Sequence, residues 1–209
     1  PDWSASPATA RALWALIDEV CGGEPHLGVG AFVDDPALAP YFRRHGGREG
    51  AAFGGGRGRF RVTERAQEAM GCRPYSNFNL VGAAQVGKSS LSGMRLLHRL
   101  AGAIPVWPVD PLPASGPVVT EIYTTLAALA AGRPAGRSKM RSHADLNAAL
   151  CAPAIASAPV AGSGPIDDHA SDALLTAAWL RRAAGDAALW QPAGLAAVAA
   201  TEGWTFGAR

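Results

Sequence analysis

The chain has 209 residues, a formal net charge of +2 at pH 7 and 48% hydrophobic residues. This length is enough for one α/β domain with a sizeable core or for two small domains, and the small net charge does not by itself require a nucleic-acid partner. The sequence has no apolar run of about 18 residues, the minimum for a transmembrane helix, so no membrane partner is expected.

The first residues and the cysteines predict a cytoplasmic location. Residues 1–3 lack the charged and apolar regions that open a signal peptide. The cysteines are odd in number, widely spaced and without a Cys-x-x-Cys pair: Cys21, Cys72 and Cys151. This pattern favours a reducing compartment and argues against a disulfide framework or a zinc site.

The first predicted element is a helix over residues 7–20, which ends at Gly22-Gly23. Its apolar face consists of Leu13, Trp14, Leu16, Ile17 and Val20. Residues 27–33 predict either a short strand or a loop, because glycines interrupt the apolar run.

Residues 41–61 form a basic, glycine-rich loop in which arginines alternate with aromatic residues. Arginine beside aromatic rings can bind the phosphates and bases of a nucleic acid, which would involve Arg57, Arg59 and Arg61. The other interpretation, favoured for this segment alone, is a mobile and solvated loop. A short helix over residues 63–70 follows.

Residues 82–89 match the phosphate-binding loop pattern G-x-x-x-x-G-K-[ST], and a helix is predicted over residues 91–100. Backbone N–H groups of such a loop surround phosphates, the lysine neutralises them and the hydroxyl binds Mg²⁺. The residues concerned are Gly82, Gly87, Lys88 and Ser89. The match is good locally, but the rest of the chain lacks the strands of a nucleotide-hydrolysing sheet.

Residues 118–126 give the clearest strand, because β-branched and aromatic residues dominate them. Glu121 lies in the middle of this strand, where glutamate is disfavoured, or faces water on an edge strand. A second basic segment, residues 133–141, includes Lys139 and Arg141 and precedes a helix that ends at Leu150. Residues 152–165 are predicted to be a flexible linker.

Residues 166–182 predict the last long helix, with Asp167 and Asp168 as N-cap candidates, and a short helix near residues 193–200 follows. At about 100° per residue, Asp168, His169 and Asp172 share one side of the long helix. The remaining positions are apolar nearly all round, which predicts a buried helix. A carboxylate such as Asp172 then needs a cation, a metal ion or hydrogen-bond donors.

Several motifs, taken in order, resemble the predicted RNase H-like nucleases, a largely uncharacterised family. They are Arg61-x-Thr63-Glu64, residues 76–93, Trp107-Pro108-x-Asp110, Glu121-Ile122-Tyr123, Lys139-x-Arg141 with Leu146, residues 168–173 and Glu202-Gly203-Trp204. The resemblance covers most of the chain and implies an α/β fold with a mixed sheet flanked by helices. It implies a single domain over residues 1–209. The first strand of the family, with its acid, would either precede Pro1 or be lost from this protein, which would then be catalytically compromised.

The family resemblance also implies a metal site. Active members of the fold hold two divalent ions with acids from strands and from the start of the last helix. By position, Glu121, Asp168 and Asp172 would be the metal ligands, and His169 would be a further ligand or a base. Two ions about 3.5–4 Å apart activate water and stabilise the leaving oxygen of a phosphodiester, and Mg²⁺ or Mn²⁺ suits oxygen ligands.

Three hypotheses follow from the sequence. The first is a metal-dependent nuclease that holds the nucleic-acid backbone through Arg57, Arg59, Arg61, Lys139 and Arg141. The second is a non-catalytic module of the same fold that binds nucleic acid or protein. The third is a nucleotide-binding protein that uses residues 82–89.

Overall fold

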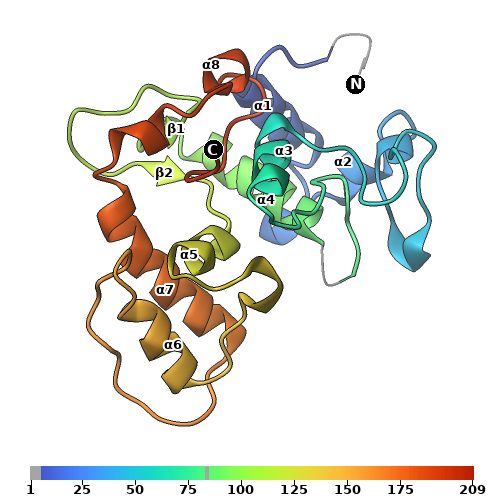
Figure 1. Ribbon diagram of the computed structural model, residues 1–209. Coiled ribbons are helices and arrows are strands. Elements are labelled where there is room, and N and C mark those ends of the chain that lie inside the picture. The colour runs from blue at the N-terminus through green and yellow to red at the C-terminus, as the bar shows by residue number, and fades with distance from the viewer. Residues whose placement is uncertain (1–5, 83–84) are drawn as a thin grey trace. The chain divides into compact units, whose positions relative to one another are not determined.

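The computed structural model describes residues 6–82 and 85–209, and these residues are mostly helical (Figure 1). They are 44% helix and 6% strand and contain eight α-helices. Their only sheet has two strands, β1 (Val106–Trp107) and β2 (Val119–Thr120), which pair in parallel. The predicted α/β fold, an RNase H-like mixed sheet flanked by helices, is therefore wrong.

The predicted strand over residues 118–126 fails for a local reason. Only Val119 and Thr120 pair with a neighbouring strand, and helix α5 (Thr124–Ala130) begins inside the expected strand. The β-branched residues that suggested the strand report a preference for half-buried pleated surfaces rather than for the extended backbone itself. The alanines and leucines that follow Thr124 favour a helix.

The chain divides into two compact units. Unit 1 comprises Pro1–Arg65, Pro74–Thr120 and Gly194–Trp204, and unit 2 comprises Ala66–Arg73, Glu121–Ala193 and Thr205–Arg209. Helix α3 (Val62–Ala69), which confirms the helix predicted over residues 63–70, continues from one unit into the other. Residues 1–3, from which a cytoplasmic location was predicted, lie outside the described residues.

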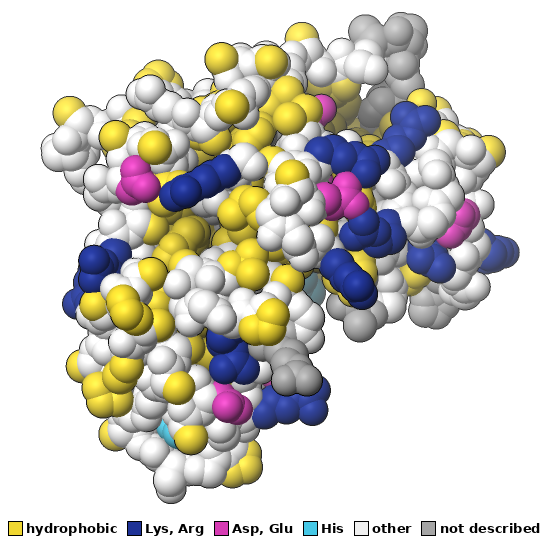
Figure 2. Space-filling model, viewed as in Figure 1, with side chains coloured by type: hydrophobic (Ala, Val, Ile, Leu, Met, Phe, Trp, Pro, Cys, Tyr) yellow, Lys and Arg dark blue, Asp and Glu magenta, His cyan; other side chains and the backbone are white. Residues whose placement is uncertain are grey.

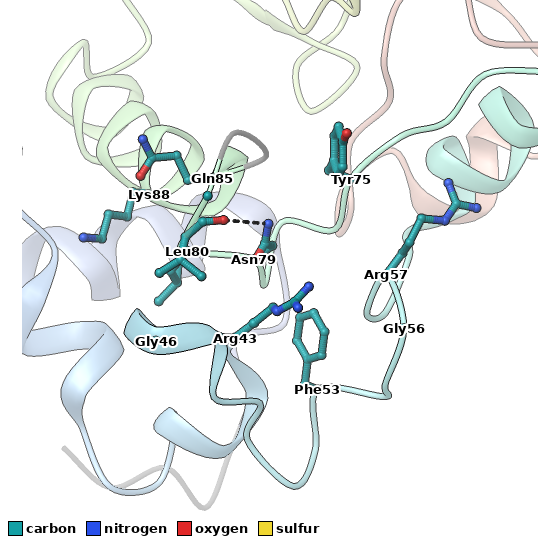
Figure 3. Close-up of a pocket in the computed structure, with 13 residues that line it drawn as sticks. Arg43, Gly46, Phe53, Gly56, Arg57, Tyr75, Asn79, Leu80, Gln85 and Lys88 are labelled. Carbon is teal, nitrogen blue, oxygen red and sulfur yellow. Dashed lines mark hydrogen bonds between the residues drawn. The ribbon is translucent and has the colours of Figure 1, made fainter. Parts of the chain in front are cut away.

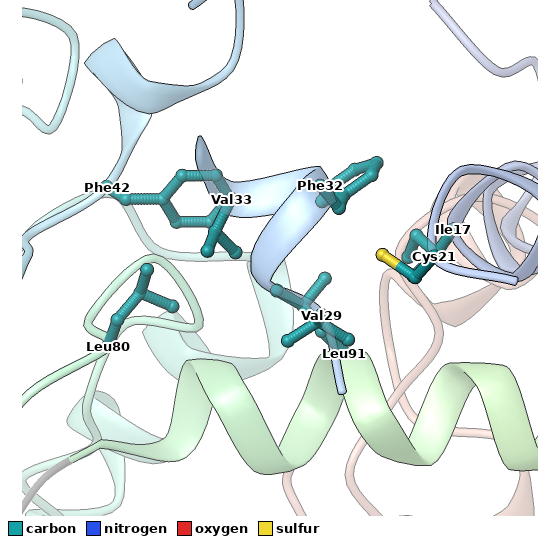
Figure 4. Close-up of a cluster of buried hydrophobic side chains, with 8 residues drawn as sticks. All are labelled: Ile17, Cys21, Val29, Phe32, Val33, Phe42, Leu80 and Leu91. Carbon is teal, nitrogen blue, oxygen red and sulfur yellow. The ribbon is translucent and has the colours of Figure 1, made fainter. Parts of the chain in front are cut away.

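Unit 1 is built on the packing of α1 (Ala10–Val20) against α4 (Val86–Arg99). The helix predicted over residues 7–20 is confirmed, and the Thr9 hydroxyl caps it by accepting a hydrogen bond from Ala12 N–H at 3.1 Å. A buried apolar cluster fills the space beside the two helices (Figure 4), comprising Ile17, Cys21, Val29, Phe32, Val33, Phe42, Leu80 and Leu91. Burial of these apolar side chains stabilises unit 1.

A buried arginine joins the same two helices. Arg95 of α4 is fully buried, donates from Nε to Asp18 of α1 at 2.8 Å and donates from Nη1 to the Gly28 carbonyl at 2.5 Å. Hydrogen bonds from Arg99 and Arg95 hold the pKa of the Asp18 carboxyl below its usual value. The ion pair therefore fixes how α1 and α4 lie against each other.

The remaining elements of unit 1 are short. They are the 3₁₀ helices η1 (Pro25–Leu27), η2 (Ala39–Tyr41) and η3 (His45–Gly47), and the helices α2 (Gly30–Asp34) and α8 (Leu195–Val198). The strand or loop predicted over residues 27–33 is wrong where α2 forms. Glu24 explains this, because its carboxylate accepts hydrogen bonds from Gly30 N–H and Ala31 N–H at the start of that helix.

Unit 2 contains α5, the 3₁₀ helices η4 (Ala135–Arg137) and η5 (Ala187–Trp190), and the helices α6 (His143–Leu150) and α7 (Asp168–Ala183). The helix ending at Leu150 and the last long helix are confirmed. Helix α7 packs on α5 and α6, and Phe206 lies 5.7 Å from Trp179 and 4.5 Å from Trp190 between ring centroids. The expected all-round burial of α7 is wrong, since Leu174 is 40% exposed.

Residues 152–165, predicted to be a flexible linker, contain no helix or strand but are held against α6. The Asn147 side chain donates to the Val160 carbonyl at 3.1 Å and accepts from Val160 N–H at 2.8 Å. Ile155 is fully buried. The segment therefore packs as part of unit 2.

Candidate functional site

The two acids predicted on the last helix do come together. Asp168 and Asp172 occupy the first two turns of α7, and the Lys139 ammonium lies 3.2 Å from Asp168 Oδ2 and 3.5 Å from Asp172 Oδ2. Thr124 at the start of α5 donates its hydroxyl to Asp172 at 3.3 Å. The Lys139 ammonium and the Thr124 hydroxyl therefore offset the cost of partly burying the Asp172 carboxylate.

The contact with the two carboxylates stabilises the charged form of Lys139. Burial acts to lower the pKa of the Lys139 ammonium, but the hydrogen bond to Asp168 and the charge of Asp172 outweigh it, so the pKa is raised above 10.5. The Lys139 ammonium therefore neutralises part of the negative charge of Asp168 and Asp172, which would otherwise attract a divalent ion.

Glu121 and His169 take no part in this cluster. The Glu121 carboxylate accepts a hydrogen bond from the Thr205 hydroxyl at 2.7 Å, and its backbone carbonyl accepts from Phe206 N–H at 2.9 Å. His169 is exposed. Among residues 6–82 and 85–209, no group of three or more His, Cys, Asp or Glu side chains is placed to hold a metal ion. The arrangement of Lys139 against Asp168 and Asp172 therefore does not fit the expected two-metal site.

The predicted backbone-binding residues are divided between different roles. Arg61 forms a 2.5 Å ion pair with the buried Glu64 and donates to the Glu202 carbonyl at 3.1 Å, so it anchors the start of α3. Arg59 lies over the ring of Tyr41, 5.5 Å from its centroid. Arg141 is exposed, with its backbone carbonyl bonded to Ile166 N–H.

Arg57, in contrast, lines a cavity of about 630 Å³ in unit 1, together with Arg43 and Lys88 (Figure 3). Arg43 and Arg57 come from the basic loop of residues 41–61, and Lys88 comes from the first turn of α4. The other lining residues are glycines, apolar residues and the uncharged polar residues Tyr75, Asn79 and Gln85. None of the described lining residues is acidic, so the cavity is an electropositive depression.

Backbone pairing creates this cavity. Arg43 N–H donates to the Phe78 carbonyl and Leu80 N–H donates to the Arg43 carbonyl, both at 3.0 Å. These bonds place the basic loop beside the segment that leads into α4. Gly46, Gly47, Gly56 and Gly82 line the cavity with φ between +54° and +79°, a backbone conformation that favours glycine.

The charges of Arg43 and Lys88 are only partly neutralised within the described part of the chain. The nearest ionic contact of Arg43 is Glu49, at 3.8 Å between Nε and Oε1, which is too long for a hydrogen bond. Arg57 donates to the Pro74 carbonyl at 3.3 Å and lies 5.0 Å from the centroid of Phe60. Lys88 is exposed and forms no ion pair within the described part of the chain.

The phosphate-loop motif contributes Gly82 and Lys88 to this cavity. Residues 83–84 of the motif lie outside the described residues. Gly87 N–H donates to the Asn79 carbonyl at 3.0 Å and the Ser89 hydroxyl donates to the Val86 carbonyl at 3.0 Å. Two groups that would contact phosphate and Mg²⁺ in a phosphate-binding loop are therefore bonded within the protein.

Figure 2 shows several Lys and Arg side chains gathered on one part of the face in view, with Asp and Glu side chains among them. No family model, curated protein or solved structure matches this chain, so the resemblance to RNase H-like nucleases stays a prediction.

No helix in the described ranges is both long and apolar enough to cross a bilayer.

Proposed function

We propose that unit 1 is a nucleic-acid-binding module that holds the phosphate backbone at the basic cavity. The observation that carries this proposal is the convergence of Arg43, Arg57 and Lys88 around one depression without an acid among its described lining residues. Cations brought together in this way repel one another, and an anionic ligand relieves the repulsion.

The chemistry of the lining suits phosphate. Arginine presents a planar set of donors that binds two phosphate oxygens at once, and lysine acts as a point charge. The glycines at positions 46, 47, 56 and 82 lack side chains that would keep a ligand from the backbone. Basic side chains beyond the cavity, among them Arg44 and Arg48, would extend the contact along a polymer.

A mononucleotide is the second candidate ligand. The observation that favours it is the position of Lys88 in the first turn of α4, on the wall of a cavity whose volume suits one nucleotide. The bonded Gly87 N–H and Ser89 hydroxyl count against a complete phosphate loop.

The proposal is tested by fluorescence anisotropy with a labelled oligonucleotide over a series of salt concentrations. Arg43→Gln and Lys88→Gln should each weaken binding and reduce the slope of log K against log salt by about 0.7 for a single strand. Arg181→Gln is the matched control, because Arg181 is an exposed arginine of α7 in unit 2. Unchanged affinity in both cavity variants would refute the proposal.

Competition separates the two ligand classes. ATP should displace the oligonucleotide only at concentrations where inorganic triphosphate does so equally, if the polymer is the ligand. Displacement by ATP at far lower concentration, lost in Lys88→Gln, would support the mononucleotide instead.

Cleavage of phosphodiesters through Mg²⁺ or Mn²⁺ stays a prediction that the same samples can test. Incubation of the oligonucleotide with Mn²⁺ and either the native protein or Asp172→Asn shows whether any cleavage depends on α7. Binding at the cavity is expected with or without such activity.

A further inference from the structure

An exposed tyrosine stands at the same cavity. Tyr75 lines the cavity, and 49% of this residue is exposed. This is the highest value among the exposed large hydrophobic residues of the described chain, shared with Leu96. Figure 3 shows its ring beside the cavity, with Arg43 and Lys88 among the other lining side chains. An aromatic face left open to solvent next to cations is a surface on which a nucleobase can stack.

Two neutral amides complete the lining. Asn79 and Gln85 each carry both a donor and an acceptor. Asn79 is buried and donates to the Val81 carbonyl at 3.1 Å, whereas Gln85 is exposed. Amides of this kind can hydrogen-bond the edges of unpaired bases, whereas phosphates accept hydrogen bonds and take only donors. The cavity therefore offers cations for a phosphate, an aromatic face for a base and the exposed Gln85 amide for the edge of that base.

We infer that the cavity accepts one unpaired nucleotide of a single-stranded nucleic acid, with its phosphate at Arg43 and Lys88 and its base stacked on Tyr75. This inference rests on the proposed function and narrows it from nucleic acid in general to single strands.

The shape of the ligand supports single strands over duplexes. A duplex presents phosphates on a convex outer surface and keeps its base faces stacked inside, so it can reach the cations but not the ring. A single strand can turn a base out of its stack at little cost. A cavity of about 630 Å³ has the size of a small-molecule site, which suits one nucleotide unit.

The test compares Tyr75→Ala with Tyr75→Phe in the full chain. Loss of the ring should weaken single-strand binding on the order of tenfold, while the phenylalanine variant should bind like the native protein because it keeps the stacking face. Leu96→Ala is the matched control, since Leu96 is also 49% exposed and lies outside the cavity lining. It should leave the affinity unchanged.

A strand that carries a 2-aminopurine base gives a direct readout of stacking. Its fluorescence should be quenched on binding to the native protein and to Tyr75→Phe, but not on binding to Tyr75→Ala. Binding of a duplex or of an abasic strand should be the same for all three proteins. Thermal melting of Tyr75→Ala should match that of the native protein, because half of the residue is already exposed.

The outcomes separate the two levels of the proposal. If Arg43→Gln and Lys88→Gln weaken binding but Tyr75→Ala binds and quenches like the native protein, the single-strand inference is wrong and the nucleic-acid function stands. If neither cation variant changes the affinity, the proposed function fails and the inference fails with it.

Discussion

Asp167→Ala is expected to destabilise unit 2 by about 1 kcal/mol. Asp167 precedes the first residue of α7, and its Oδ1 accepts a hydrogen bond from Ala170 N–H at 2.9 Å. Alanine leaves that N–H without its side-chain partner. Because Asp167 is exposed, water replaces the lost bond in part, which places the loss in the middle of the usual range of about 0.5–2 kcal/mol for an N-cap.

Asp167→Asn separates the hydrogen bond from the charge. Asparagine keeps an oxygen that can accept from Ala170 N–H, and it is about as good an N-cap as aspartate. It removes the negative charge at the start of α7, a contribution of about 0.3–1 kcal/mol at an exposed position. We therefore expect the asparagine variant to be clearly more stable than the alanine variant.

Hydrogen exchange measured by mass spectrometry on a peptide from α7 gives a local readout, which is useful because two compact units can unfold in separate steps. A loss of about 1 kcal/mol should speed the exchange of amides that open with unit 2 about fivefold. Equal acceleration in Asp167→Asn and Asp167→Ala would refute the capping argument. It would leave the charge of Asp167 as the stabilising feature.

Two further predictions concern single contacts. Gly207→Ala should cost about 2–5 kcal/mol, since its φ is +88° and a Cβ would lie 2.6 Å from the Trp179 ring. Gly132 has φ +78° and open space around it, so Gly132→Ala should cost only about 1–2 kcal/mol. Urea unfolding of both variants measures the two losses of stability, and equal losses would contradict a clash with the Trp179 ring. Although burial acts to raise it, the pKa of Asp110 is lowered by its hydrogen bond and ion pair with Arg11, so its stabilisation should disappear as the pH falls below 3.8. Acid titration of unfolding should show a weaker dependence in Asp110→Asn, and an unchanged dependence would contradict this role.

The helices could be predicted from the sequence because their signals are local. The apolar face that ends at Val20 and the cap at Asp167 each depend on residues within a few turns, and both were found as expected. The two-stranded sheet depends instead on the pairing of Val106 with Val119, thirteen positions further along the chain. Local pattern carries no information on such a partner, and Glu121 was assigned to a strand that ends before it.

Two motifs that carried the resemblance to RNase H-like nucleases have structural roles. Glu202 accepts a hydrogen bond from Val62 N–H at 2.8 Å, which caps α3, and Asp110 accepts from Val106 N–H at 2.8 Å at the start of β1. An acid that satisfies backbone donors is a sound structural choice in any fold. The spacing of acids along a sequence does not distinguish this use from ligation of a metal.

The difference between the two candidate sites lies in which charges remain unbalanced. Asp168 and Asp172 were predicted from the sequence as an acidic pair, but the fold brings Lys139 from a separate segment against both, so a cation entering there must displace an ammonium. Arg43 and Lys88 come from segments that were predicted separately, as a solvated loop and as a phosphate loop, yet the fold places them around one cavity whose described lining is free of acids. Residue types can be read from a sequence, whereas the sign of the charge left over at a site depends on which distant segments the fold brings together. The basic cavity of unit 1, and not the acidic pair of α7, therefore offers the charge that a ligand can neutralise.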